Sequence, residues 1–166
     1  MAKIGWIGLG QMGTPMVENL LKGSIDVTVY NRSFDKTLPL VEKGAKNTKN
    51  VEEIFEQNDI IFFMISNYSA ALEILNENVL SKIKGKKIVN MSTISPTESK
   101  AVGKLVIENN GKYIEAPVSG SVGAATAGVL LILVGGNKAD TEDLYSIFDI
   151  LGSKTYYFGE LGKATG

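Results

Sequence analysis

The chain has 166 residues, 44% of them hydrophobic, which is long enough for one domain with a sizeable core. Seventeen basic and eighteen acidic residues give a formal net charge of −1, and no basic block is present, so the sequence argues against nucleic-acid binding. Cysteine and histidine are both absent, which excludes disulfides, thiolate nucleophiles, serine triads of the His form and the usual zinc ligand sets. We therefore expect a domain without a metal site.

A glycine-rich turn follows the first predicted strand. Residues 3–7 are apolar and lead into a G-x-G-x-x-G spacing, after which residues 12–22 show the apolar spacing of a helix. In a dinucleotide-binding unit Gly8 allows the tight turn, Gly10 lets the backbone approach a pyrophosphate, and Gly13 lets the helix pack closely on its strand. The free N–H groups and the dipole of the helix start favour that phosphate. The alternative is a strand-to-helix turn without a ligand. The predicted cofactor-binding residues here are Gly8, Leu9, Gly10, Gln11, Met12 and Gly13.

The second predicted strand, residues 26–30, ends in a sequence that bears on the choice of dinucleotide. NAD-selective sites place an acid about 20 residues after the glycines, where it binds the adenine ribose hydroxyls. This chain has Asn31, Arg32 and Ser33 there instead. A carboxylate would repel a 2′-phosphate, whereas the Arg32 guanidinium can bind one and stack on the adenine. The sequence therefore favours NADP over NAD, the alternative being that Arg32 is an ordinary solvated residue.

The rest of the chain alternates between strand-like and helical patterns. Further strands are predicted at residues 59–65, 87–91, 112–115, 129–134 and 154–158. Further helices are predicted at residues 34–43, 51–57, 69–80, 96–109 and 140–151. This alternation predicts one α/β domain over residues 1–166, a Rossmann-type doubly wound fold whose mainly parallel sheet carries helices on both faces.

The most apolar run, residues 60–65, is far too short to cross a bilayer and suits a central parallel strand. The N-terminus shows no signal segment with a cleavage site. We expect a soluble cytoplasmic protein with no membrane partner, and the lack of cysteine is compatible with a reducing cytosol.

Small and polar residues follow several predicted strands, where ligands bind in folds of this kind. Residues 66–68, 92–96 and 116–121 each follow a strand, and their hydroxyl and backbone donors could orient a nicotinamide and a small carboxylate. Taken singly, each is an ordinary helix cap or turn. The further cofactor-binding residues predicted at these ends are Met64, Ser66 and Thr93.

Residues 119–128 have the highest density of small residues in the chain. We interpret them as a loop with close backbone approach, whose successive N–H groups can form an anion-binding nest for a carboxylate. The alternative is a flexible surface connection.

Several motifs in order give the chain a resemblance to the cofactor-binding domain of the β-hydroxyacid dehydrogenases, the family of 3-hydroxyisobutyrate dehydrogenase and tartronate semialdehyde reductase, within the 6-phosphogluconate dehydrogenase superfamily. The resemblance spans nearly all 166 residues. The motifs are the glycine turn at 8–13 with Pro15 and Met16, Ser92 and Thr93 before Pro96, residues 116–120 through Gly128, and Gly135 with Gly136.

The resemblance implies an oxidoreductase that interconverts a small 3-hydroxy acid and its semialdehyde by hydride transfer with a nicotinamide. It implies that Ser119, Gly120 and Ser121 bind the substrate, that Thr93 lies near the nicotinamide, and that Asn31 with Arg32 selects NADP. It also implies that the catalytic lysine lies beyond Gly166, so Lys163 receives no catalytic role and this chain alone is catalytically incomplete. The family's helical second domain, through which members chiefly associate, is absent from this sequence, and the full-length protein is expected to be a homo-oligomer.

Two alternatives stay open at this point. One is an imine reductase of the same superfamily, which shares the glycine turn and the Asn-Arg ending, although residues 116–120 argue against it. The other is a dinucleotide-binding module that performs no chemistry.

Overall fold

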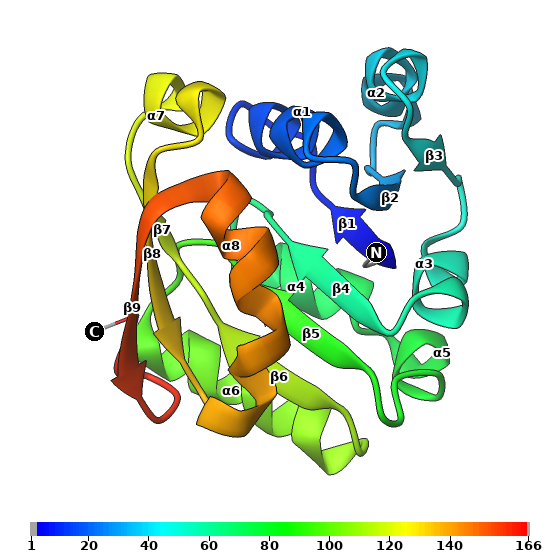
Figure 1. Cartoon of the computed structure of the whole chain (residues 1–166). Coiled ribbons are helices and arrows are strands. Elements are labelled where there is room, and N and C mark those ends of the chain that lie inside the picture. Colours follow the sequence, from blue (N-terminus) through cyan, green and yellow to red (C-terminus); the bar gives the residue numbers. More distant parts are fainter. Residues whose placement is uncertain (1–2, 166) are drawn as a thin grey trace.

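In a computed structural model of the chain, which describes residues 3–165, strands and helices alternate along the sequence (Figure 1). The predicted domain limits, residues 1 and 166, lie outside the described residues. The strands are β1 (Lys3–Ile7), β2 (Asp26–Tyr30), β3 (Lys46–Asn47), β4 (Ile60–Phe63), β5 (Lys87–Asn90), β6 (Lys112–Glu115), β7 (Val118–Ser119), β8 (Leu130–Gly135) and β9 (Gly152–Gly159). The α-helices are α1 (Gly13–Lys22), α2 (Leu38–Glu42), α3 (Val51–Gln57), α4 (Tyr68–Ile74), α5 (Glu77–Leu80), α6 (Pro96–Glu108), α7 (Val122–Ala127) and α8 (Tyr145–Leu151), and 3₁₀-helices η1 (Phe34–Thr37) and η2 (Lys138–Leu144) precede α2 and α8.

The strands form one sheet. Its parallel part has the order β3-β2-β1-β4-β5-β6, which is the strand order of the doubly wound dinucleotide-binding fold. Beyond β6, strand β8 runs antiparallel to both β6 and β7, and β9 pairs with β8 in parallel. The predicted Rossmann-type sheet is confirmed, with its antiparallel strands confined to one end.

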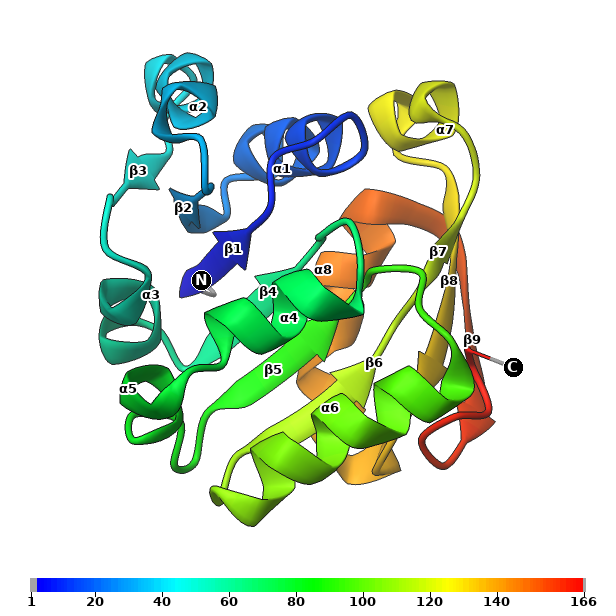
Figure 2. The same ribbon diagram turned by 180° about the vertical axis from the view of Figure 1, so that it is seen from behind.

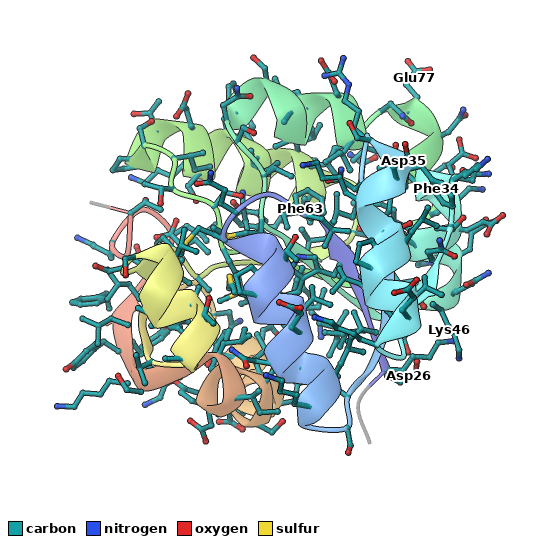
Figure 3. The ribbon with its side chains drawn as sticks, turned by 90° about the horizontal axis from the view of Figure 1, so that it is seen from above. Asp26, Phe34, Asp35, Lys46, Phe63 and Glu77 are labelled. Atoms are coloured by element: carbon teal, nitrogen blue, oxygen red, sulfur yellow. The ribbon has the colours of Figure 1, made fainter. Side chains whose placement is uncertain are left out.

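Helices cover both faces of this sheet, and each face has its own hydrophobic core. On one face, Met16 and Leu20 of α1 and Phe148 of α8 pack with Trp6 and Phe62, whose rings stack with centroids 5.5 Å apart. Helices α3 to α6 contribute to the core on the other face, and α4 and α6 lie in front of the sheet in Figure 2. Figure 3, seen from above, places α1, α2 and α7 on one side of the molecule and the green helices on the other. A ligand can therefore reach the ends of the strands but not the faces of the sheet.

Strand β4 is central because its side chains are apolar on both sides. Phe62 belongs to one core and Ile61 and Phe63 to the other, and all three are fully buried. An ion pair at the outer end of the sheet joins Asp26 of β2 to Lys46 of β3, with a distance of 3.5 Å between the Asp26 Oδ2 and the Lys46 Nζ atoms (Figure 3).

Three predicted helices are divided in the structure. The helix expected at 34–43 begins as the 3₁₀-helix η1 and continues as α2 over residues 38–42. The helix expected at 69–80 stops at Ile74, and α5 starts afresh because the Asn76 side chain accepts a hydrogen bond from the Val79 amide and so caps it. The helix expected at 140–151 begins as the 3₁₀-helix η2. The two-residue strands β3 and β7 went unpredicted because so short a stretch carries no periodic pattern.

The interpretation of residues 119–128 as a loop was wrong over most of its length. Residues 122–127 form helix α7, which Ser121 caps by accepting a hydrogen bond from the Ala124 amide. Gly128 ends the helix in the left-handed conformation, with φ of 72°. The small side chains let α7 lie beside α1, where the Asn19 amide group donates a hydrogen bond of 2.8 Å to the Ala125 carbonyl (Figures 1 and 2).

Within residues 3–165, no helix is both long enough and apolar enough to span a membrane. The cytoplasmic location stays a prediction.

The buried phenol of Tyr113 makes stability depend on pH at the alkaline end. Burial raises the pKa of Tyr113 to about 12, and the negative charge of Glu115 acts in the same direction. The native protein holds this proton more tightly than the unfolded chain, whose tyrosines titrate near pH 10, so the contribution is complete below about pH 10 and is lost as the pH rises toward 12.

We predict that by about pH 11 the protein loses on the order of 1 kcal/mol more unfolding free energy than its Tyr113→Phe variant does, relative to neutral pH. Urea unfolding of both proteins across this range measures the difference. Parallel pH curves for the two proteins would show that Tyr113 does not titrate as stated.

Candidate functional site

A cavity of about 760 Å³ opens where β1, β2 and β4 end. The glycine turn after β1, the segment after β2, the residues after β4, and helix α4 all contribute to its walls. Most of the predicted cofactor-binding residues lie together here. Those that line the cavity are Gly8, Leu9, Gly10, Gln11, Met12, Gly13, Asn31, Arg32, Met64 and Ser66.

The three glycines of the turn meet different constraints. Gly8 has a φ of 112°, and a Cβ atom there would lie 2.0 Å from the Met64 carbonyl oxygen. A Cβ atom on Gly13 would lie 2.1 Å from the Gly8 carbonyl oxygen, so α1 can start this close to the strand only with glycine. A Cβ atom on Gly10 would have no other atom within 4 Å. Gly8 and Gly13 thus build the turn, and Gly10 leaves its outer side free for a ligand.

Helix α1 presents its N-terminus to this cavity. Met12 is the N-cap residue, and no side chain of the described residues caps the helix by a hydrogen bond. The buried Trp6 indole donates a hydrogen bond of 2.9 Å to the Gly8 carbonyl, so this acceptor is occupied within the protein. An uncapped helix start with its positive dipole end facing a cavity is suited to an anion such as a pyrophosphate.

Asn31 connects the glycine turn to the segment after β2. Its side-chain oxygen accepts a hydrogen bond of 2.9 Å from the Leu9 amide, and its side-chain nitrogen donates one of 2.9 Å to the Ser33 carbonyl. Both ends of the Asn31 amide are therefore engaged within the protein. Asn31 lines the cavity, but its hydrogen bonds hold the turn in place, which the sequence did not reveal.

Two cations and one acid stand at the mouth of the cavity. Arg32, the single arginine of the sequence, is exposed there. Lys36 of η1 lines the same cavity, and sequence reasoning missed it because the turn of η1 decides that its side chain reaches the cavity. Glu73 of α4 also lines the cavity. Ser33, predicted with Arg32, does not line it and offers its carbonyl to Asn31.

Apolar side chains complete the walls. Val51, Ile65, Ala70 and Ile74 line the cavity, and sequence reasoning missed all four. Val51, Ala70 and Ile74 belong to predicted helices and Ile65 to a predicted strand, but these patterns do not show which residues reach the end of the sheet. The cavity therefore combines an anion site at the start of α1 with an apolar part, as the phosphates and the base of a nucleotide require.

The remaining predicted residues lie outside this cavity. Thr93 is exposed beyond the end of β5, next to Ser92, whose buried hydroxyl accepts a hydrogen bond of 2.8 Å from the Ile65 amide. Ser119 ends β7 and Gly120 follows with a φ of 147°, and both are exposed. Thr93, Ser119, Gly120 and Ser121 are not lining residues of the cavity that holds the glycine turn. Their assignments to the nicotinamide and the substrate stay predictions.

Acidic side chains do not gather anywhere in residues 3–165 into a group of three or more that could hold a metal ion. What the arrangement offers chemically is a place to bind and orient a phosphate-bearing nucleotide.

Two known proteins are similar in sequence to nearly the whole chain. It is 37% identical over 164 residues to glyoxylate/succinic semialdehyde reductase 1 of Arabidopsis thaliana, covering 97% of this chain and 57% of that protein. It is 35% identical over 165 residues to the cytokine-like nuclear factor N-PAC of Homo sapiens, covering 98% of this chain and 30% of that protein. The chain thus spans little more than half the length of one relative and less than a third of the other.

The fold is also that of a solved structure, Mycobacterium tuberculosis 3-hydroxyisobutyrate dehydrogenase with L-serine. The TM-score is 0.93 at 24% identity, and the match covers 99% of this chain and 57% of that one. Residues 3–159 match the model of the NAD-binding domain of 6-phosphogluconate dehydrogenase, and the chain belongs to this family of dinucleotide-binding domains.

Proposed function

We propose that the chain is the NADP-binding domain of an oxidoreductase that transfers a hydride between NADP(H) and a small hydroxy acid or its semialdehyde. The observation that carries the proposal is the cavity at the glycine turn, with Arg32 and Lys36 at its mouth and no acid among residues 31–33. Its substrate class is supported by the relative from Arabidopsis, which is named a reductase of glyoxylate and succinic semialdehyde.

The charges at the cavity mouth support the choice of NADP. A 2′-phosphate next to Arg32 and Lys36 would gain charge-assisted hydrogen bonds, whereas next to Glu73 it would be repelled. The pyrophosphate would then bind at the start of α1, and the adenine against apolar walls such as Val51 and Ile74. The nicotinamide supplies the hydride, and the chain's own residues bind and orient it.

The substrate side rests on the exposed residues beyond β5 and β7. Thr93 and Ser119 offer hydroxyl groups there, and neither side chain donates or accepts a hydrogen bond within residues 3–165. Ser121 caps α7, so its hydroxyl oxygen already accepts one hydrogen bond from the Ala124 amide. We therefore assign substrate binding chiefly to Ser119. Separately, we expect the full-length protein to be a homo-oligomer.

Arg32→Asp should reverse the cofactor preference. Loss of charge-assisted hydrogen bonds worth about 1.5–3 kcal/mol corresponds to a fall in NADP affinity of about 10- to 100-fold, while NAD affinity is kept or improved. Titration calorimetry with both cofactors measures the change. Lys154→Asp on exposed β9 makes the same change in net charge away from the cavity and serves as the control. Equal affinity of the unsubstituted chain for the two cofactors would contradict the proposal.

A chimera tests the reaction. Residues 3–159 of this chain replace the corresponding part of the Arabidopsis reductase, so that the remainder of that protein completes the enzyme. We predict that it oxidises NADPH with succinic semialdehyde or glyoxylate and not with cyclic imines. Binding of NADPH without turnover would favour a module that performs no chemistry, and turnover of imines alone would favour an imine reductase.

Ser119→Ala in this chimera should raise the KM for the aldehyde or lower kcat by about 3- to 10-fold, the equivalent of one hydrogen bond, and leave NADP affinity nearly intact. Ser146→Ala on the exposed side of α8 is the matched control. Loss of NADP binding in the Ser119 variant would instead assign the segment to the cofactor.

A further inference from the structure

Glu115 is a buried acid that the proposed function does not use. It ends β6 and is 1% exposed. The ion pairs found within residues 3–165 do not include it. A buried carboxylate without a cation is costly unless hydrogen-bond donors surround it.

Donors from two distant parts of the chain meet this carboxylate. Its Oε1 atom accepts hydrogen bonds from the Ser99 hydroxyl at 2.6 Å and the Gly162 amide at 2.9 Å. Its Oε2 atom accepts them from the Ala164 amide at 2.9 Å and the Thr165 amide at 3.2 Å. Both oxygens accept from backbone N–H groups, so a proton on either would face another donor. The geometry fits the ionised carboxylate.

Two glycines make room for this arrangement. Gly135 lies opposite Glu115 in the register of β6 and β8, and a Cβ atom there would lie 2.7 Å from the Glu115 Oε2 atom. Gly162 has a φ of 92°, a left-handed conformation that favours glycine, and the turn can therefore bring its amide to the carboxylate. The carboxylate therefore joins three parts of the molecule: strand β6, helix α6 through Ser99, and the turn at 162–165.

A directional series of hydrogen bonds ends on the same carboxylate. The Asn90 side chain donates to the Tyr113 hydroxyl at 3.2 Å. The Ser99 hydroxyl donates its hydrogen bond to Glu115. In the 3.3 Å contact between the Tyr113 and Ser99 hydroxyls, Tyr113 is therefore the donor and Ser99 the acceptor. Each bond points toward the negative charge, and such series strengthen one another in a medium of low polarity.

The series also reaches the cofactor cavity. The Asn90 side-chain oxygen accepts a hydrogen bond of 3.0 Å from the Ser92 amide, and the Ser92 hydroxyl accepts one of 2.8 Å from the Ile65 amide. Ile65 lines the cavity. These hydrogen bonds, linked through the covalent bonds of Ser92 and of the Asn90 amide group, connect Ile65 in the wall of the cavity to the turn at 162–165.

We propose that Glu115 is a positioning residue, whose buried carboxylate holds the turn at 162–165 in a fixed place beside the strand end that leads to Ser119. The inference rests on the proposed function, which assigns substrate binding to the segment around Ser119. Ser119 follows Glu115 by four residues, through 116–118. A shift of the turn would leave the end of β6, from which this segment continues, without its backbone hydrogen-bond donors.

Amide hydrogen exchange and amide proton shifts, measured by NMR on the whole chain, test the proposal. In Glu115→Gln the new NH₂ group faces the Ala164 and Thr165 amides, so we expect exchange at Gly162, Ala164 and Thr165 to accelerate at least about tenfold and their proton resonances to move upfield. Amides of β5 serve as the internal reference, because they report general loss of stability.

Two further variants complete the test. Glu108→Gln removes an exposed acid from α6 and should leave the three amides unchanged. Ser99→Ala removes one donor but keeps the three backbone donors, so its effect on the turn should be smaller than that of Glu115→Gln.

Exchange at 162, 164 and 165 that stays unchanged in Glu115→Gln, or rises only in step with the β5 amides, would overturn the positioning role. An unsubstituted chain that binds no NADP would overturn the proposed function instead, and the exchange experiment would still decide the role of Glu115.

Discussion

The close approach of the backbone at Gly8 is the constraint on which the site depends. The Met64 carbonyl oxygen lies where a side chain of residue 8 would begin, and the Gly8 carbonyl lies where a side chain of residue 13 would begin. These contacts bring the ends of β1 and β4 together and start α1 directly above them. The uncapped helix start, the segment after β2 and the residues after β4 then enclose one cavity. A side chain at residue 8 would separate these parts.

Two side chains outside the glycine turn hold it in place by hydrogen bonds. Trp6 binds the Gly8 carbonyl from inside the core, and Asn31 binds the Leu9 amide from the neighbouring strand. The turn is therefore held from both sides without using the helix start itself. Arg32 remains exposed at the mouth, where its charge is available to a ligand. The two groups of residues therefore differ physically. Those that hold the turn have their hydrogen bonds within the protein, whereas the Arg32 side chain is free to bind a phosphate.

Local chemistry explains which features could be predicted from the sequence. The glycine turn and the central strand were predictable, because close backbone contact requires glycine and burial on both faces requires an unbroken apolar run. Helix α7 was not, because its six mostly small residues carry no apolar spacing, and its partner α1 is distant in sequence. Lys36 and Ile74 were missed for a similar reason, since packing of η1 and α4 decides that they reach the cavity. Glu115 did give a signal, an acid at the end of a largely buried strand, but its backbone donors come from almost 50 residues away.

An NMR titration of the isotope-labelled chain with NADP tests the central claim most directly. The account predicts that the backbone amides of residues 8–13 and 31–33 shift most, together with those lining the cavity at Met64 and Ser66, and that the amides of β9 stay in place. Absence of saturable shifts, or the largest shifts at a surface away from the glycine turn, would contradict it.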